Sequence, residues 1–96
     1  MKHETNEMIR RFNRLMIPNP DRIGMLYNHG LRTVAHYILG HKYMYDLSEH
    51  DTMINNLIAR IVDKYLIQDP ETSEEFAFNN GINDAIDIIR SYRLRR

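Results

Sequence analysis

The chain has 96 residues, no cysteine, and 13 basic residues balanced by 13 acidic ones. This length predicts a single helical domain, residues 1–96, near the lower limit of what folds without disulfides or bound metal. The lack of cysteine excludes disulfides and thiolate metal sites and fits a reducing compartment, so we expect a cytoplasmic protein. Residues 1–14 are too polar for a secretory signal. No apolar run approaches the roughly 20 residues that span a bilayer, so we expect no membrane partner.

The first predicted element is an amphipathic helix that ends near the sequence Ile17-Pro18-Asn19-Pro20. Its apolar residues recur at helical spacing, at Met8, Phe12 and Leu15. Proline fits the first position of a helix, and asparagine fits the cap that precedes it. The sequence therefore predicts that a second helix begins here, with Asn19 as its N-cap and Pro20 as its first residue.

The second segment also has helical periodicity, but three glycines interrupt it. Its apolar face contains Tyr27, Leu31, Val34 and Ile38. A glycine inside a helix costs about 1 kcal/mol relative to alanine, and a glycine commonly follows the last helical turn. We therefore expect a bent helix or one broken near Gly30. The alternative is an intact helix whose glycines permit close packing.

Two further helices follow, and capping residues mark the start of each. Ser48 and Asp51 mark the third helix, whereas the fourth has two possible caps, Asp69 and Thr72, the latter with Glu75 at capping-box spacing. The apolar positions of the fourth helix are Phe78, Ile82, Ala85, Ile86, Ile88, Ile89 and Tyr92. No segment keeps the period of a strand, and no repeat is evident. The sequence predicts an all-α fold, a small bundle of about four helices.

Two features of the pattern favour self-association. The apolar stripe of the fourth helix is wider than the face that one neighbouring helix would cover. The charges are also uneven, because the chain is basic up to Tyr45, acidic from Asp46 to Asp87, and basic again from Ile88 to Arg96. Such asymmetry favours pairing of opposite faces, within one chain or between copies. We therefore expect a homo-oligomer, with a homodimer as the working hypothesis.

The histidines do not have the spacing of a metal site. His29 and His36 lie seven residues apart, with Arg32 between them. Two histidines that bind one zinc ion on a helix are three or four residues apart, whereas seven residues span about 10 Å of helix axis. Arg32 would also repel a cation. We therefore expect no metal and no cofactor, and we interpret these residues, together with His41, as a polar face.

The sequence Arg32-Thr33-Val34-Ala35-His36 places a guanidinium and an imidazole on one helical face, where both could contact a phosphate. This short segment resembles the Arg-(four to six residues)-His motif of the HEPN family of helical ribonucleases. The resemblance implies an alternative function, a metal-independent ribonuclease in which Arg32 and His36 of paired protomers handle the phosphate and the proton transfer. The segment departs from the motif, because only three residues separate Arg32 from His36.

Two basic patches predict another alternative, a regulator that binds nucleic acid. One patch comprises Arg10, Arg11 and Arg14, and the other comprises Arg90, Arg93, Arg95 and Arg96. Arginines interleaved with an aromatic side chain, here Tyr92, are typical of surfaces that contact nucleic acids. Arginines at the end of a helix also complement its dipole without any ligand, so both explanations stay open.

The segment from Gly40 to Tyr45 is rich in the aromatic and adaptable side chains that are favoured at interfaces. The predicted binding surface accordingly comprises His29, Arg32, His36, His41, Lys42, Tyr43 and Tyr45. The predicted function is that of a non-enzymatic binding protein, which occupies a surface of a protein partner or sequesters a small anionic ligand. The short chain and its segment Asn79-Asn80-Gly81-Ile82-Asn83-Asp84-Ala85-Ile86 are similar in style to small phage-encoded accessory proteins, including inhibitors of host machinery.

Overall fold

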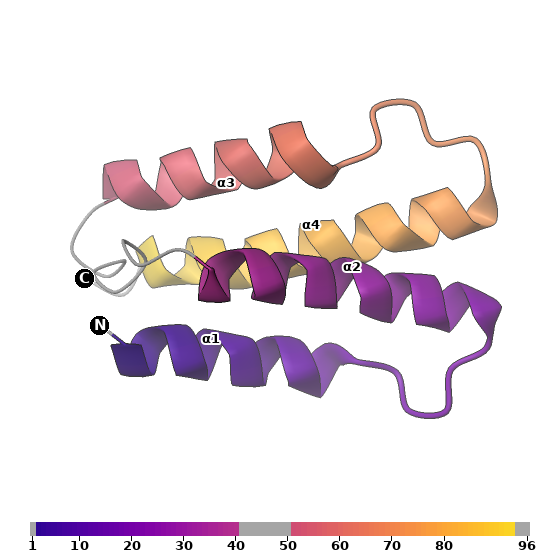
Figure 1. Ribbon diagram of the computed structural model, residues 1–96, viewed down its shortest axis with the longest axis horizontal. Coiled ribbons are helices and arrows are strands. Elements are labelled where there is room, and N and C mark those ends of the chain that lie inside the picture. Colours follow the sequence, from indigo (N-terminus) through magenta and orange to yellow (C-terminus); the bar gives the residue numbers. More distant parts are fainter. Residues whose placement is uncertain (1, 41–50, 94–96) are drawn as a thin grey trace.

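A computed structural model describes the backbone of residues 2–40 and 51–93 and the side chains of residues 5–40 and 54–92. This part of the chain forms four helices and no strand: α1 (Lys2–Leu15), α2 (Arg22–Leu39), α3 (Asp51–Tyr65) and α4 (Ser73–Arg93). Helices α2 and α4 lie side by side and run in the same direction, and α1 and α3 flank them (Figure 1). The predicted all-α bundle of four helices is confirmed. None of these helices is long and apolar enough to cross a bilayer.

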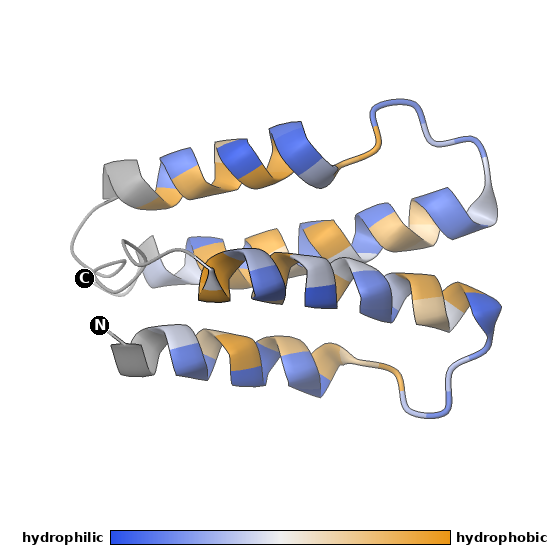
Figure 2. Ribbon diagram, viewed as in Figure 1, coloured by the Kyte–Doolittle hydropathy of each residue, from blue (hydrophilic) through white to orange (hydrophobic). Residues whose placement is uncertain are grey.

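One hydrophobic core draws on all four helices. Its fully buried side chains include Phe12 of α1, Leu31 of α2, Ile61 of α3, and Ile82 and Tyr92 of α4. Apolar residues from each helix pack together in this core. Hydrophobic and hydrophilic residues alternate along all four helices, as expected of amphipathic helices (Figure 2). Each fully buried aliphatic side chain contributes about 1.5–3 kcal/mol relative to exposure. The four helices therefore depend on one another for their stability.

The wide apolar stripe of α4 is covered within the chain. Ile82, Ala85, Ile86, Ile88 and Ile89 are each at most 9 % exposed. Helix α4 contacts α1, α2 and α3, so that three helices share its apolar surface instead of one. The width of this stripe therefore requires no second copy of the protein, and homo-oligomerisation stays a prediction that rests on charge asymmetry alone.

Helix α2 begins two residues later than predicted. Its N-cap is Asp21, whose carboxylate accepts a hydrogen bond of 2.8 Å from the amide of Gly24, and its first residue is Arg22. Asn19 lies in the preceding turn with a φ of 49°, a left-handed conformation that asparagine tolerates better than most residues. The prediction of Asn19 as cap and Pro20 as first helical residue is wrong, because the aspartate that follows them supplies an equally good cap.

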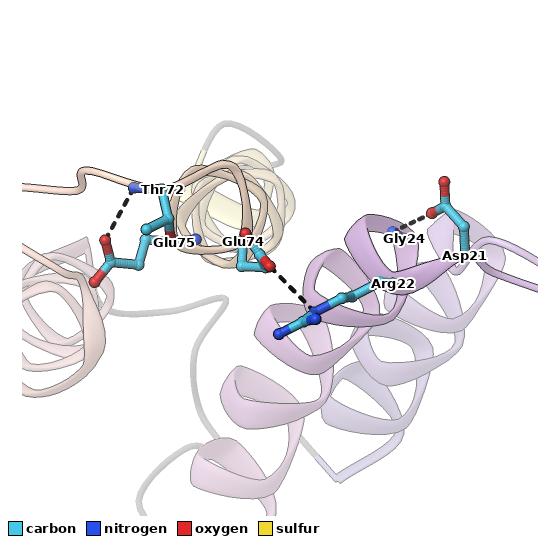
Figure 3. A network of polar contacts seen from close by, with 6 residues as sticks. All are labelled: Asp21, Arg22, Gly24, Thr72, Glu74 and Glu75. Carbon is cyan, nitrogen blue, oxygen red and sulfur yellow. Dashed lines mark hydrogen bonds and ion pairs between the residues drawn. The ribbon is translucent and has the colours of Figure 1, made fainter.

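At the start of α4, Thr72 rather than Asp69 is the cap. The Thr72 hydroxyl accepts a hydrogen bond from the amide of Glu75, and the Glu75 carboxylate accepts one from the amide of Thr72. This capping box is one of the two arrangements that the sequence allows. Hydrogen bonds from the amides of Glu71 and Thr72 lower the pKa of Glu75. Nearby, Arg22 of α2 reaches across to Glu74 at 3.1 Å (Figure 3).

Helix α2 passes through Gly30 without a break, so the predicted interruption there is wrong. At this point α2 comes very close to α4. A Cβ atom on Gly30 would collide with the carbonyl oxygen of Phe78 and lie 3.1 Å from the Cα of Gly81. A Cβ on Gly81 would collide in turn with the carbonyl oxygen of Tyr27. The glycines serve the close approach of two helix backbones, which is the alternative explanation that the sequence left open.

The two halves of the chain form equivalent helical hairpins, α1 with α2 and α3 with α4. In the first, the side chain of Asn28 donates to the carbonyl of Ile17 at 3.0 Å and accepts from its amide at 2.8 Å. In the second, Asn79 makes the same two bonds to Ile67, each 2.9 Å long. Both asparagines are buried. Each therefore fixes the connection between two helices to the second helix of its hairpin.

Burial confirms the equivalence residue by residue. Residues 27–39 of α2 and residues 78–90 of α4 follow the same order of buried, intermediate and exposed positions. The two hairpins are therefore equivalent in structure, although the sequence shows no evident repeat. Only Asn28, Gly30 and Ile38 have identical counterparts in α4, and the second connection contains one extra residue, so the repeat is not apparent in the sequence.

Candidate binding surface

The exposed face of α2 carries the central residues of the predicted binding surface. Met25, His29, Arg32, His36 and Leu39 are all exposed, and we call these five residues the α2 stripe. They follow one another in steps of three or four residues, so they lie on one side of the helix, away from its buried face. From Met25 to Leu39 the stripe is about 21 Å long, at 1.5 Å per residue.

The structure brings His29, Arg32 and His36 together on this stripe, in agreement with their predicted common face. The imidazole of His29 lies beside the ring of Phe78 in α4, with 5.4 Å between the ring centroids and a tilt of 41°. His29 is thereby supported on one side by the neighbouring helix, which limits its freedom. The other predicted binding residues, His41, Lys42, Tyr43 and Tyr45, lie outside the described residues.

Arg32 is an exposed cation in the middle of the stripe. Among the described residues, no carboxylate pairs with its guanidinium, whereas Arg22 pairs with Glu74 at 3.1 Å and Arg90 with Asp87 at 3.4 Å. An exposed charge without such a partner keeps its full attraction for an opposite charge on another molecule.

The ends of the stripe are apolar. Met25 is 57 % exposed and Leu39 is 59 % exposed, the highest values among the exposed large hydrophobic residues. The sequence-based prediction missed both residues. Helical spacing could have found them, because Met25 lies four residues before His29 and Leu39 three residues after His36. Together the five side chains form a surface that is apolar at both ends and basic in between.

The equivalent face of α4 has a different chemistry. The residues that correspond in position to the α2 stripe are Phe76, Asn80, Asn83, Asp87 and Arg90, and all five are exposed; we call them the α4 stripe. Of the chemical character of the α2 stripe, the α4 stripe retains only the apolar residue at its start, Phe76 in place of Met25. The central arginine is replaced by Asn83, and the second histidine by Asp87, which forms an ion pair with Arg90. Two faces with the same place in the fold therefore differ in charge.

Arg11 of the first basic patch lies where α1 packs against the end of α4. The guanidinium of Arg11 donates a 2.8 Å hydrogen bond to Ser91 and lies 5.5 Å from the ring centroid of Tyr92. The Tyr92 hydroxyl donates a hydrogen bond to Glu7 at 2.6 Å. Burial of the hydroxyl is the main reason that the pKa of Tyr92 is raised, and the bond to Glu7 raises this pKa further. Arg11 therefore has a structural role in joining the two helices.

Three other arginines of the two patches are exposed. Arg10 and Arg14 are exposed on α1, and Arg90 is exposed on α4. The backbone of Arg93 belongs to α4, but its side chain, like Arg95 and Arg96, lies outside what the structure describes. Nucleic-acid binding through these patches stays a prediction.

The described residues contain no cluster of three histidine, aspartate or glutamate side chains that could hold a metal ion. Arg32 and His36 share one exposed face, as the ribonuclease hypothesis requires. That hypothesis also requires a paired protomer and a substrate, and it stays a prediction.

Comparison with protein-family models, with curated proteins and with solved structures yields no match.

Proposed function

We propose that this protein is a non-enzymatic binding protein that docks an acidic segment of a partner protein on the α2 stripe. The observation that carries the proposal is the charge of this face. Arg32 is exposed between two histidines, and the exposed residues of α2 include no acidic side chain; they are Arg22, Ile23, Met25, His29, Arg32, His36 and Leu39. A surface of one sign attracts and orients a partner of the opposite sign.

The apolar ends of the stripe indicate the shape of the partner. Met25 and Leu39 can exclude water from the charge contacts between them, as apolar surroundings do in protein interfaces. A helix of about 14 residues, with acidic side chains in the middle and an apolar side chain at each end, matches the length of about 21 Å. We therefore favour an acidic amphipathic helix as the occupant.

The comparison of the two hairpins supports a binding role for this face. Since α2 and α4 have equivalent positions, the packing of the bundle makes the same demands on both stripes. The α2 stripe nevertheless contains Arg32 and His36, whereas the α4 stripe contains Asn83 and Asp87 at the equivalent positions. Packing does not explain the basic character of the α2 stripe, whereas a partner does.

The proposed mode of action is occupation of a partner's surface, as in a small accessory or inhibitor protein. Such a protein needs no catalytic group of its own. A cytoplasmic location and self-association are part of the proposal, and the mass of the protein in solution tests the homodimer.

The proposal is tested with a synthetic 14-residue helix that has glutamate along one face and leucine at both ends. Titration calorimetry should detect binding that weakens with added salt, because screening reduces attraction between exposed charges. Arg32→Glu should weaken binding at least tenfold, since reversal of a central charge costs more than about 1.4 kcal/mol. The matched control is Arg90→Glu, which makes the same change of charge on the α4 stripe and should alter affinity less than twofold.

Four results would contradict the proposal. The first is no binding of the peptide, and the second is an equal loss of affinity in Arg32→Glu and Arg90→Glu. The third is cleavage of a short RNA by the purified protein, abolished by Arg32→Ala, which would favour the ribonuclease hypothesis. Inorganic phosphate and uncleaved RNA serve as competitors, and displacement of the peptide by either would identify a general anion site instead.

A further inference from the structure

We infer that the α4 stripe is an inactive second copy of the docking surface, produced by duplication of one helical hairpin. The inference rests on the proposed function of the α2 stripe and adds two statements to it. The chain binds one partner, on one of two equivalent faces, and the other face can be converted into a second site by exposed substitutions alone.

The connections between the helices are fixed in the same way in both hairpins. A helical hairpin can fix its connection in many ways, and most need no buried side chain. Here both hairpins use an asparagine that bonds the amide and the carbonyl of a single isoleucine, Ile17 or Ile67. In both, the asparagine lies two residues before the glycine of the close contact. Two unrelated hairpins would not be expected to share all of these details.

The contact between α2 and α4 is reciprocal. A Cβ on Gly30 would meet the Phe78 carbonyl and lie 3.0 Å from the Ile82 amide nitrogen, and a Cβ on Gly81 would meet the counterparts of these atoms, in Tyr27 and Leu31. Each helix thus presents to its partner the same surface that the partner presents in return. This self-complementarity is the property of a twofold dimer of identical subunits. One chain that contains it is explained by fusion of two copies of such a subunit.

The exposed positions show where the copies have diverged. Buried counterparts have similar character, apolar in Leu31 and Ile82 and polar in Asn28 and Asn79, because the packing requires it. Exposed counterparts are free of this requirement, and there the charge changes from Arg32 to Asn83. The α4 stripe has therefore kept its place in the fold and lost the charge that attracts an acidic partner.

The test converts the α4 stripe and counts the bound peptides. The gain variant changes four exposed residues to their α2 counterparts: Asn80→His, Asn83→Arg, Asp87→His and Arg90→Leu. The stoichiometry of the acidic peptide in titration calorimetry should rise from one to two per chain. A transfer variant adds three opposite substitutions, His29→Asn, Arg32→Asn and His36→Asp. It should bind one peptide again, at the converted face.

The outcomes separate the two proposals. If the unaltered protein binds one peptide and the gain variant, with unchanged helicity and thermal midpoint, also binds only one, the inference is overturned and the proposed function stands. If the unaltered protein binds no peptide, the proposed function fails and the inference fails with it. If the fourfold variant is unstable, the double variant Asn80→His with Asn83→Arg replaces it, and absence of a second site there counts equally against the inference.

Discussion

A single methyl group added at Gly30 or Gly81 has no room in the contact between α2 and α4. The new Cβ of Gly30→Ala would lie 3.0 Å from the amide nitrogen of Ile82 and 3.1 Å from the Cα of Gly81, and closer still to the carbonyl oxygen of Phe78. All three are backbone atoms of one helix. No side chain can turn aside to relieve the overlap, so the two helices must move apart.

Two opposing terms set the size of the effect. Alanine is favoured over glycine inside a helix by about 1 kcal/mol, which would stabilise Gly30→Ala in an isolated α2. Overpacking of a close contact costs typically about 1–3 kcal/mol, and occasionally more. Because the obstruction is backbone, we expect the upper part of this range. The net loss is then about 2 kcal/mol, which lowers the melting temperature of a domain of this size by about 8–16 °C.

Thermal and urea unfolding followed by circular dichroism measure this loss. The matched control is Gly40→Ala, at a glycine that follows the end of α2. There the nearest atoms to an added Cβ are carbonyl oxygens at 3.5 and 3.6 Å, and the φ of −82° suits alanine. This variant should be neutral or stabilised by up to about 1 kcal/mol. If Gly30→Ala proved as stable as Gly40→Ala, the helices could separate freely and the account of the contact would be wrong.

Two further substitutions test the polar contacts. Asn79→Ala leaves the amide and carbonyl of Ile67 without their partner and should cost about 2 kcal/mol in urea unfolding, whereas Asn80→Ala, at the exposed neighbour, should change little. Tyr27→Phe removes the 2.6 Å bond to Asp84 and should cost about 1 kcal/mol at neutral pH. Burial, together with this bond, raises the pKa of Tyr27 from 10.0 to about 12. The neutral Tyr27 hydroxyl therefore contributes fully to the free energy of unfolding below pH 10, and this contribution is lost as the pH rises through 12. Between pH 8 and pH 12, the free energy of unfolding should fall less steeply for Tyr27→Phe than for the unaltered protein. Equal slopes would show that Tyr27 does not cause the loss of stability at high pH.

The number and type of helices could be predicted from periodicity and capping residues, since both are local. Met8 and Phe12 recur at helical spacing and are fully buried. The first residue of α2 could not be predicted from Asn19 and Pro20, because three consecutive residues were each suitable for a cap or a first turn. The choice of Asp21 depends on the turn that precedes it, in which Asn19 takes a left-handed conformation.

The role of Gly30 could not be predicted, because it depends on Gly81, which lies 51 residues away in the sequence. Alone, a glycine in a helical pattern favours a break. Paired with a second glycine across a helix contact, it favours continuity. The repeated Asn-x-Gly, at Asn28 and Asn79, was the available signal, and it was concealed by the low identity of the residues around it.

The common face of His29, Arg32 and His36 could be predicted, because helical spacing alone determines it. Helical spacing also places Met25 and Leu39 on this face, whereas their exposed fractions and the ion pair of Arg90 with Asp87 required the structure. The difference in charge between equivalent faces became visible only when the two hairpins could be compared position by position.

The largest contact between helices, that of α2 with α4, joins the first half of the chain to the second. Each half of the chain thus covers the apolar face of the other half. If the peptide chain were severed between residues 40 and 51, the two pieces would each be incomplete and would be expected to recognise one another and reassemble. Recovery of helicity on mixing two such pieces would measure how strongly this one contact holds the protein together.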